Sequence, residues 1–123
     1  MKKLSTDNAP KAEHILSQGI VSGNTVYVAG QIHQRPDGSI VEGSVKEKVE
    51  QIMKNISAIL QEANASIDDI VKVVIYVTDM AQMPELNEVY PTYFTEPFPV
   101  REAVGVQALP LGATIEISVV AIK

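Results

Sequence analysis

Apolar residues recur along the 123-residue chain with two different periods, and the periods predict two kinds of element. Between residues 45 and 63 they return every three or four positions, which predicts an amphipathic helix. Its apolar stripe consists of Val45, Val49, Ile52, Met53, Ile56, Ile59, Leu60 and Ala63. Ser44 and Glu47 form a capping box, in which the serine hydroxyl accepts from the third helical amide and the glutamate reaches back. The sequence therefore predicts a sharp helix start after Ser44.

Strand-like patterns occupy much of the remaining chain. Residues 14–33 are expected to form two strands around a Ser-Gly-Asn-Thr turn, because Gly-Asn tolerates the positive φ of a hairpin. The second of these places Val26, Val28, Gly30 and Ile32 on one face and Tyr27, Ala29, Gln31 and His33 on the other. Residues 70–78 are almost all β-branched or aromatic, which predicts a central strand covered on both faces. Residues 100–108 and 113–122 are expected to pair as a hairpin through a Leu-Pro-Leu-Gly turn.

The remaining segments complete a single domain over residues 1–123. The first thirteen residues have no period and are predicted to be a surface arm, and residues 35–38 have turn chemistry. Residues 83–94 are predicted to form a second helix, with Pro91 ending, kinking or tightening it. The order favours an α+β fold, in which a mixed, mostly antiparallel sheet has both helices packed on one face.

Two helices leave the other face of the sheet open, although it is half apolar. In the last strand, the predicted helix face is Ile115, Ile117, Val119 and Ala121, and the opposite face is Thr114, Glu116, Ser118, Val120 and Ile122. An exposed sheet face of this kind usually marks an interface. The sequence therefore predicts a homo-oligomer, with a monomer that keeps a mildly apolar face as the alternative.

Composition excludes several classes of protein. The chain is 46% hydrophobic and 20% charged, which excludes intrinsic disorder. No apolar run approaches the roughly 18 residues of a membrane span, and no apolar stretch follows the first lysines as in a secretory signal. The absence of cysteine excludes disulfides, thiol nucleophiles and thiolate metal sites. A cytoplasmic protein without membrane contact is expected.

Charge and motifs narrow the function further. With 10 basic and 15 acidic residues the net charge is −5, which weakens the case for a nucleic-acid partner. His14 and His33 have no carboxylate at ligand spacing, so both are interpreted as ordinary surface or strand histidines and no metal site is expected. The chain has none of the common nucleotide-binding or hydrolase motifs, and no cofactor is expected.

The last two strands contain the best candidate chemistry. If they pair as a hairpin with Gly105 opposite Glu116, then Arg101 and Ala103 share the uncovered face with that glutamate. A guanidinium grips a carboxylate with two parallel hydrogen bonds, and a partly desolvated glutamate can act as a general base on water. An Arg101–Glu116 ion pair at an interface is the alternative interpretation.

Several segments resemble the RidA/YjgF family of enamine/imine deaminases. They are residues 17–20 (SQGI), 28–32 (VAGQI), 87–90 (NEVY), 99–110 (PVREAVGVQALP) and 115–117 (IEI). The resemblance extends over essentially the whole chain and implies a chorismate-mutase-like homotrimer with sites between subunits. It also implies cofactor-free hydrolysis of 2-imino acids, such as 2-iminopropanoate and 2-iminobutanoate, to 2-keto acids and ammonia.

The same resemblance implies roles for individual residues. Arg101 would hold the substrate carboxylate, and Glu116 would orient or activate water. Backbone groups near Gly30 and Ala103 would line the pocket, and Asn87 would lie near it. Whether Arg101 and Glu116 of one site come from one chain is left open.

Three positions depart from the family pattern. Leu16, Ala29 and Ala103 stand where family deaminases often have Tyr, Ser and Cys. Losing the thiol matters little if only the backbone of Ala103 contacts substrate, whereas losing the Tyr and Ser removes an aromatic wall and a hydroxyl. Leu16 would make the pocket more apolar, which favours larger aliphatic imino acids or weakens turnover.

Two other functions remain open at this point. The first is a non-catalytic trimer that binds small 2-keto carboxylates. The second, less favoured, is a translation inhibitor or endoribonuclease, a function that has also been attributed to the family and that the acidic composition disfavours.

Overall fold

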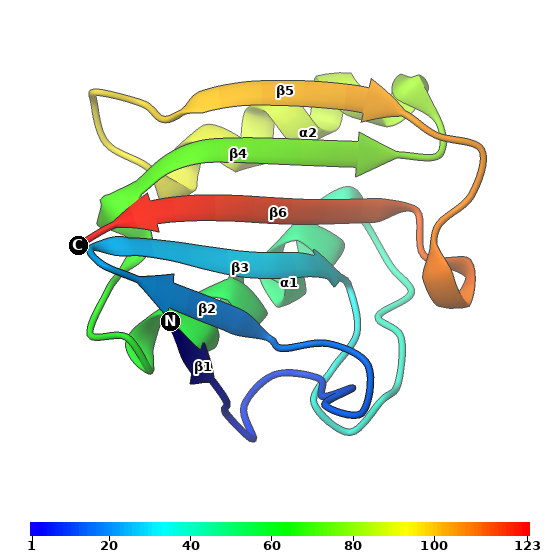
Figure 1. Ribbon diagram of the computed structural model, residues 1–123. Helices are drawn as coiled ribbons and strands as arrows, with labels where there is room; N and C mark the ends of the chain where they lie inside the picture. The colour runs from blue at the N-terminus through cyan, green and yellow to red at the C-terminus, as the bar shows by residue number, and fades with distance from the viewer.

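A six-stranded sheet forms one layer of the protein in the computed structural model, which describes residues 1–123 (Figure 1). The strands are β1 (Lys2–Leu4), β2 (Gly19–Ser22), β3 (Thr25–Ile32), β4 (Ile70–Val77), β5 (Val100–Gly105) and β6 (Ile115–Ile122). Their order across the sheet is β1-β2-β3-β6-β4-β5, and every neighbouring pair is antiparallel except the parallel pair β4 and β5. The predicted mixed, mostly antiparallel sheet is confirmed.

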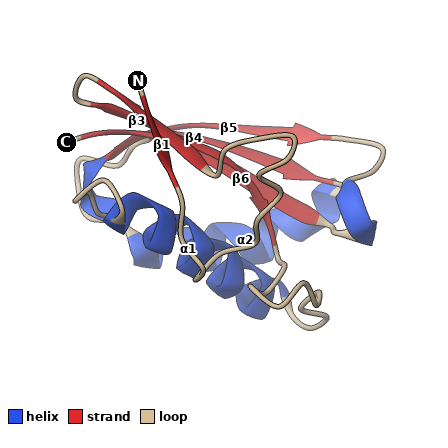
Figure 2. Ribbon diagram, turned by 60° about the horizontal axis from the view of Figure 1, so that its bottom comes forward, coloured by secondary structure: helices blue, strands red, loops and turns tan.

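Two helices, α1 (Val45–Gln61) and α2 (Met83–Val89), pack on one face of this sheet, as predicted (Figure 2). The capping box of α1 is present: the Glu47 amide donates to the Ser44 hydroxyl and the Ser44 amide donates to the Glu47 carboxylate, both at 3.1 Å. The second helix is shorter than predicted. It ends at Val89 and continues as the 3₁₀ turn η3 (Tyr90–Tyr93), since Pro91 has no amide hydrogen to extend an α-helical ladder.

The core lies between the helices and the sheet. The apolar stripe of α1, which includes Ile52 and Ile56, is buried there. It packs with inward-facing residues of β4 and β6, among them Ile75, Ile115 and Ile117. The assignment of alternate β6 residues to the helix face is therefore confirmed. β4 is covered on this face only, so the prediction of a strand covered on both faces is wrong for the single chain.

The N-terminal segment is not the surface arm that the sequence predicts. β1 pairs with β2, and Leu4 and Ala9 are buried in the core. Gln18 holds the segment in place: its side-chain carbonyl accepts from the Thr6 amide at 2.7 Å, and its amide group donates to the carbonyl oxygens of Thr6, Ala9 and Pro10. These hydrogen bonds order a segment whose sequence has no periodic pattern of apolar residues.

A β-bulge in β3 overturns the predicted alternation beyond Val28. Val28 is opposite Val119 and Gln31 is opposite Ile117, so β3 contains one extra residue between these pairs. The bulge turns Gln31 and the following His33 toward the helix side, where both are buried. His33 is therefore a buried residue directly after β3, so a surface position is wrong for this histidine.

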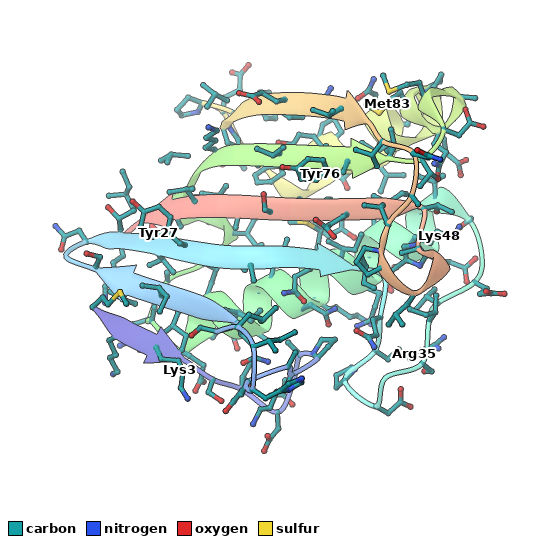
Figure 3. The ribbon with its side chains drawn as sticks, turned by 45° about the vertical axis from the view of Figure 1, so that its right-hand side comes forward. Lys3, Tyr27, Arg35, Lys48, Tyr76 and Met83 are labelled. Atoms are coloured by element: carbon teal, nitrogen blue, oxygen red, sulfur yellow. The ribbon has the colours of Figure 1, made fainter.

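The opposite face of the sheet is open and partly apolar, as predicted. Figure 3 shows Tyr27 and Tyr76 on it, with the helices behind the sheet. Tyr27 and Ile122 are each 51% exposed, and Val104 is 41% exposed. Neither α1 nor α2 combines the length with the apolar composition that a membrane-spanning helix needs.

Candidate functional site

A cavity of about 300 Å³ lies between the N-terminal segment, β3 and the 3₁₀ turn η4 (Pro110–Gly112). Four of the predicted site residues line it: Leu16, Ala29, Gly30 and Glu116. The N-terminal segment forms one wall because Gln18 fixes its backbone beside β3. The structure thus brings together four of the seven site residues predicted from the sequence.

Glu116 is the acidic group of the cavity. Its carboxylate lies over Gly30, where an added Cβ atom would be only 2.6 Å from Oε2. The side chain is half-buried, and it forms no hydrogen bond or ion pair within the chain. Burial raises the pKa of the Glu116 carboxyl above its usual value. An unpaired carboxyl with a raised pKa is suited to accept and return a proton.

The rim of the cavity is apolar. Ile15, Leu16 and Leu111 line it and are 73%, 46% and 66% exposed. Leu111 has a φ of 58°, a left-handed conformation that is unusual for a residue with a branched side chain. The rim therefore presents aliphatic surface to whatever enters the cavity.

A buried histidine holds the turn that carries Leu111. The Nδ1 atom of His33 donates to the Val41 carbonyl oxygen at 2.8 Å, and its Nε2 atom accepts from the Thr114 amide at 3.0 Å. Lys48 of α1, which is labelled in Figure 3, donates to the Thr114 hydroxyl, also at 3.0 Å. Burial lowers the pKa of His33, in keeping with a neutral ring whose Nε2 is an acceptor. The strand alternation could not reveal this role, because the bulge in β3 is what turns His33 inward.

The other predicted site residues, Arg101, Ala103 and Asn87, lie outside this cavity. Arg101 is exposed on the edge strand β5, and its guanidinium carbon is 4.9 Å from the centroid of the Tyr90 ring. Ala103 packs against the core on the same strand, and Asn87 is exposed on α2, one turn before Tyr90. Tyr90 was not predicted as a site residue, although it belongs to the segment that carries the family resemblance.

The predicted pairing of the last two strands is wrong. β6 lies between β3 and β4 and has no free edge, so β5 pairs with β4 instead, in parallel. Arg101 is opposite Val73, whose side chain is in the core, whereas Glu116 is opposite Tyr76 on the open face. Arg101 and Glu116 thus face opposite sides of the sheet, on strands that lie roughly 10 Å apart with β4 between them. A single chain cannot present both groups to one small molecule.

Because of this separation, Arg101 and Glu116 of one chain do not form an ion pair with each other. Arg101 has no carboxylate within ion-pair distance, and Lys11, the cation at the cavity, is bonded to Asp7 at 2.6 Å. No group of three or more His, Asp or Glu side chains is arranged to hold a metal ion. The Glu116 half therefore has an acid whose neighbouring cation is already paired, and the Arg101 half has a cation without an acid.

Comparisons with known proteins place the whole chain in one family. The family model described as "Endoribonuclease L-PSP" matches residues 6–123. A rat protein named 2-iminobutanoate/2-iminopropanoate deaminase is 38% identical over 123 residues, covering 99% of this chain and 90% of the rat protein.

Solved structures agree with this result. The crystal structure of yeast Mmf1 superposes with a TM-score of 0.95 at 43% identity, covering 99% of this chain and 98% of the yeast chain. The crystal structure of RidA from an Antarctic Psychrobacter species superposes with a TM-score of 0.94 at 39% identity and covers both chains completely. The resemblance seen in the sequence is thereby confirmed, and the chain belongs to the RidA/YjgF family.

Proposed function

We propose that the protein hydrolyses small 2-imino acids, such as 2-iminopropanoate and 2-iminobutanoate, to 2-keto acids and ammonia. The observation that carries the proposal is the separation of Glu116 and Arg101 into two incomplete half-sites on opposite faces of the sheet. A complete site forms when Arg101 of one copy reaches the Glu116 cavity of another. The deaminase name of the rat relative supports the reaction.

Each half-site has a clear part in this reaction. Arg101 binds the substrate carboxylate through two parallel hydrogen bonds, which its planar fork of donors allows. This contact holds the C=N carbon in the cavity, near the Glu116 carboxylate. Imines are reactive toward water, so orientation together with one acid–base group can supply the catalysis.

The proton transfers balance through Glu116 alone. Water adds to the C=N carbon while the carboxylate accepts one of its protons and delivers it to the imine nitrogen, which gives a tetrahedral carbinolamine. The carboxylate then takes the carbinolamine hydroxyl proton and passes it to the nitrogen. The C–N bond breaks, ammonia leaves and the 2-keto acid remains. The raised pKa of Glu116 makes its carboxylate a better acceptor of the water proton.

A homotrimer is the assembly that we propose for these shared sites. The open sheet face, with Tyr27, Val104 and Ile122 exposed on it, is the apolar surface that neighbouring copies would cover. A closed ring of copies with the same interface repeats the same site at every junction.

RNA cleavage is the second candidate, because the family model has the description of an endoribonuclease. The residues give it less support. Both ring nitrogens of His33 are engaged with Val41 and Thr114, so a pair of histidines for phosphodiester cleavage is not formed. The cavity cation, Lys11, is bonded to Asp7, and the net charge of −5 opposes phosphate binding.

Ammonia release from 2-iminobutanoate, generated in the assay by a threonine dehydratase, tests the proposal. Arg101→Ala should raise KM strongly, and Glu116→Gln should lower kcat by about 10²-fold or more while 2-oxobutanoate still binds. Arg35→Ala is the matched control, because Arg35 is the only other arginine and lies in an exposed turn. Wild-type protein that binds 2-oxobutanoate but leaves the rate at its buffer value would identify a non-catalytic binder.

Mixed oligomers test whether the site is shared. Each of the two variants alone should have the reduced activity described above. Oligomers reassembled from an equal mixture of Arg101→Ala and Glu116→Gln chains should recover full activity at about one site in four, since intact residues then meet at some junctions. No recovery in the mixture would contradict a site built from two copies.

A further inference from the structure

The guanidinium of Arg101 is placed by an aromatic ring and by no hydrogen bond or ion pair. Its central carbon lies 4.9 Å from the centroid of the Tyr90 ring, within the range of a cation–π contact. No carboxylate is within ion-pair distance of Arg101 in the chain. The contact with Tyr90 therefore decides where this long side chain points on an otherwise exposed edge strand.

The Tyr90 ring is itself fixed. Only 6% of the residue is exposed, and its ring centroid lies 4.8 Å from that of Phe94, with the planes tilted by 40°. Tyr90 opens the 3₁₀ turn η3, which is closed by a hydrogen bond from the Phe94 amide to the Pro91 carbonyl oxygen at 3.2 Å. The ring is thus a rigid platform that belongs to the core.

A platform of this kind leaves the guanidinium free to bind an anion. The aromatic ring covers a face of the guanidinium, whereas its five N–H donors lie in its plane and point outward. Holding the group before the ligand arrives reduces the conformational entropy that binding would otherwise cost. Tyr90 does not need to contact the ligand for this effect.

We propose that Tyr90 is a positioning residue that holds Arg101 ready for the substrate carboxylate, an inference that rests on the proposed function. The aromatic ring is the working part. The Tyr90 hydroxyl is buried without a hydrogen-bond partner in the chain, and it is not required for the ring to cover the guanidinium.

Three variants separate the ring from the hydroxyl and from general packing. Tyr90→Leu removes the ring, and Tyr90→Phe removes only the hydroxyl. Tyr93→Leu removes another aromatic residue of η3, one that forms no cation–π contact with Arg101. In Tyr90→Leu, we expect the KM for 2-iminobutanoate and the Kd for 2-oxobutanoate to rise roughly two- to thirty-fold, while kcat changes less than about twofold. Tyr90→Phe and Tyr93→Leu should keep wild-type values.

A second measurement does not depend on activity. Side-chain NMR relaxation at the Nε–H group should show Arg101 more ordered than Arg35 in the wild type and in Tyr90→Phe, and disordered in Tyr90→Leu. If Tyr90→Leu does not fold, the wild type and Tyr90→Phe decide the question by the same measurement.

Two results would overturn the inference. One is an Arg101 side chain as mobile as Arg35 in the wild type, and the other is a Tyr90→Phe variant that loses as much affinity as Tyr90→Leu. A wild type that neither hydrolyses 2-iminobutanoate nor binds 2-oxobutanoate would instead refute the proposed function, while the NMR comparison would still test the contact between Tyr90 and Arg101.

Discussion

The Glu116 carboxylate occupies the space that a side chain on Gly30 would need. A Cβ atom added to Gly30 would lie 2.6 Å from Oε2 and 3.0 Å from Cδ of Glu116. The bulge in β3 places Gly30 beneath this carboxylate, so the absence of a side chain at this position makes room for the Glu116 side chain.

Gly30→Ala should therefore displace Glu116 without unfolding the protein. The group in the way is the end of a flexible side chain, so we expect the free energy of unfolding to change by less than about 1 kcal/mol. The kcat for 2-iminobutanoate should fall roughly 10- to 100-fold, because a displacement near 1 Å can cost this much.

Gly43→Ala is a matched control for this variant. A Cβ atom on Gly43 would lie 2.8 Å from Oε1 of Glu47, which is the same kind of crowding in the α1 capping box. It should cost about 1 kcal/mol of stability and leave kcat unchanged. Equal losses of kcat in both variants, or none in Gly30→Ala, would contradict the role assigned to Gly30.

The raised pKa of Glu116 predicts a pH-dependent cost to stability. Between its unfolded pKa, about 4.3, and its higher pKa in the folded protein, the folded state binds more protons than the unfolded state. The free energy of unfolding contributed by this group therefore falls as the pH rises through that window. Glu116→Gln should remove this trend.

Urea denaturation of the wild type and Glu116→Gln at a series of pH values measures the effect. The stability of the wild type relative to the variant should decline with rising pH and become constant above the folded pKa. Glu62→Gln, at the exposed end of α1, is the control. A relative stability that increases with pH would show that the Glu116 pKa is lowered instead.

The lowered pKa of His33 predicts a loss of stability as the pH falls, the opposite of the trend expected for Glu116. Burial is the main cause of its lowered pKa, and the charge of Lys48 adds to it while that of Glu42 opposes it. Protonation would remove the Nε2 lone pair that accepts from the Thr114 amide. Stability contributed by this group is present above the unfolded pKa, about 6.5, and is lost as the pH falls toward the lower folded value.

The control for this prediction is the second histidine. His14 is exposed, so His14→Gln should keep the wild-type loss of stability below about pH 6.5, whereas His33→Gln should be less stable at neutral pH and should lack that loss. Thermal unfolding across this pH range checks it. Identical pH profiles for the two variants would exclude His33 as the responsible group.

Gln18→Met should release the N-terminal segment. The substitution keeps the size of the side chain but leaves the backbone groups of Thr6, Ala9 and Pro10 without their partner, which should cost about 2–4 kcal/mol. Hydrogen exchange at the Thr6 amide should accelerate. Gln61→Met, on the exposed end of α1, should change neither quantity; slow exchange at Thr6 in Gln18→Met would show that other contacts hold the segment.

The aliphatic rim of the cavity predicts a preference for larger substrates. Imines generated from Leu and Met should have higher kcat/KM values than the imine from Ala, because Leu16 can cover their side chains. Leu16→Ala should reduce this preference roughly tenfold, the effect of one or two methylene contacts in an apolar pocket. Initial rates with the three imines test it, and a wild type without bias away from the smallest would refute it.

Much of the architecture followed from local patterns. The period of the α1 stripe, the capping box at Ser44 and the alternation in β6 depend on neighbouring residues only, and all three are confirmed. The uncovered, partly apolar sheet face followed from having two helices and one sheet. The family followed from short motifs, in particular the segment around Arg101.

The geometry of the candidate site did not follow from the sequence, because it depends on which strands become neighbours. The sequence by itself indicated Arg101, Gly30 and Glu116 as candidate site residues. Only the tertiary structure decided that β6 enters the sheet between β3 and β4, and that a bulge turns His33 inward. Strand order and bulges arise from contacts between distant segments. Because β4 lies between β5 and β6, Arg101 and Glu116 face opposite sides of the sheet. The local periodicity of a strand does not specify which other strands it pairs with.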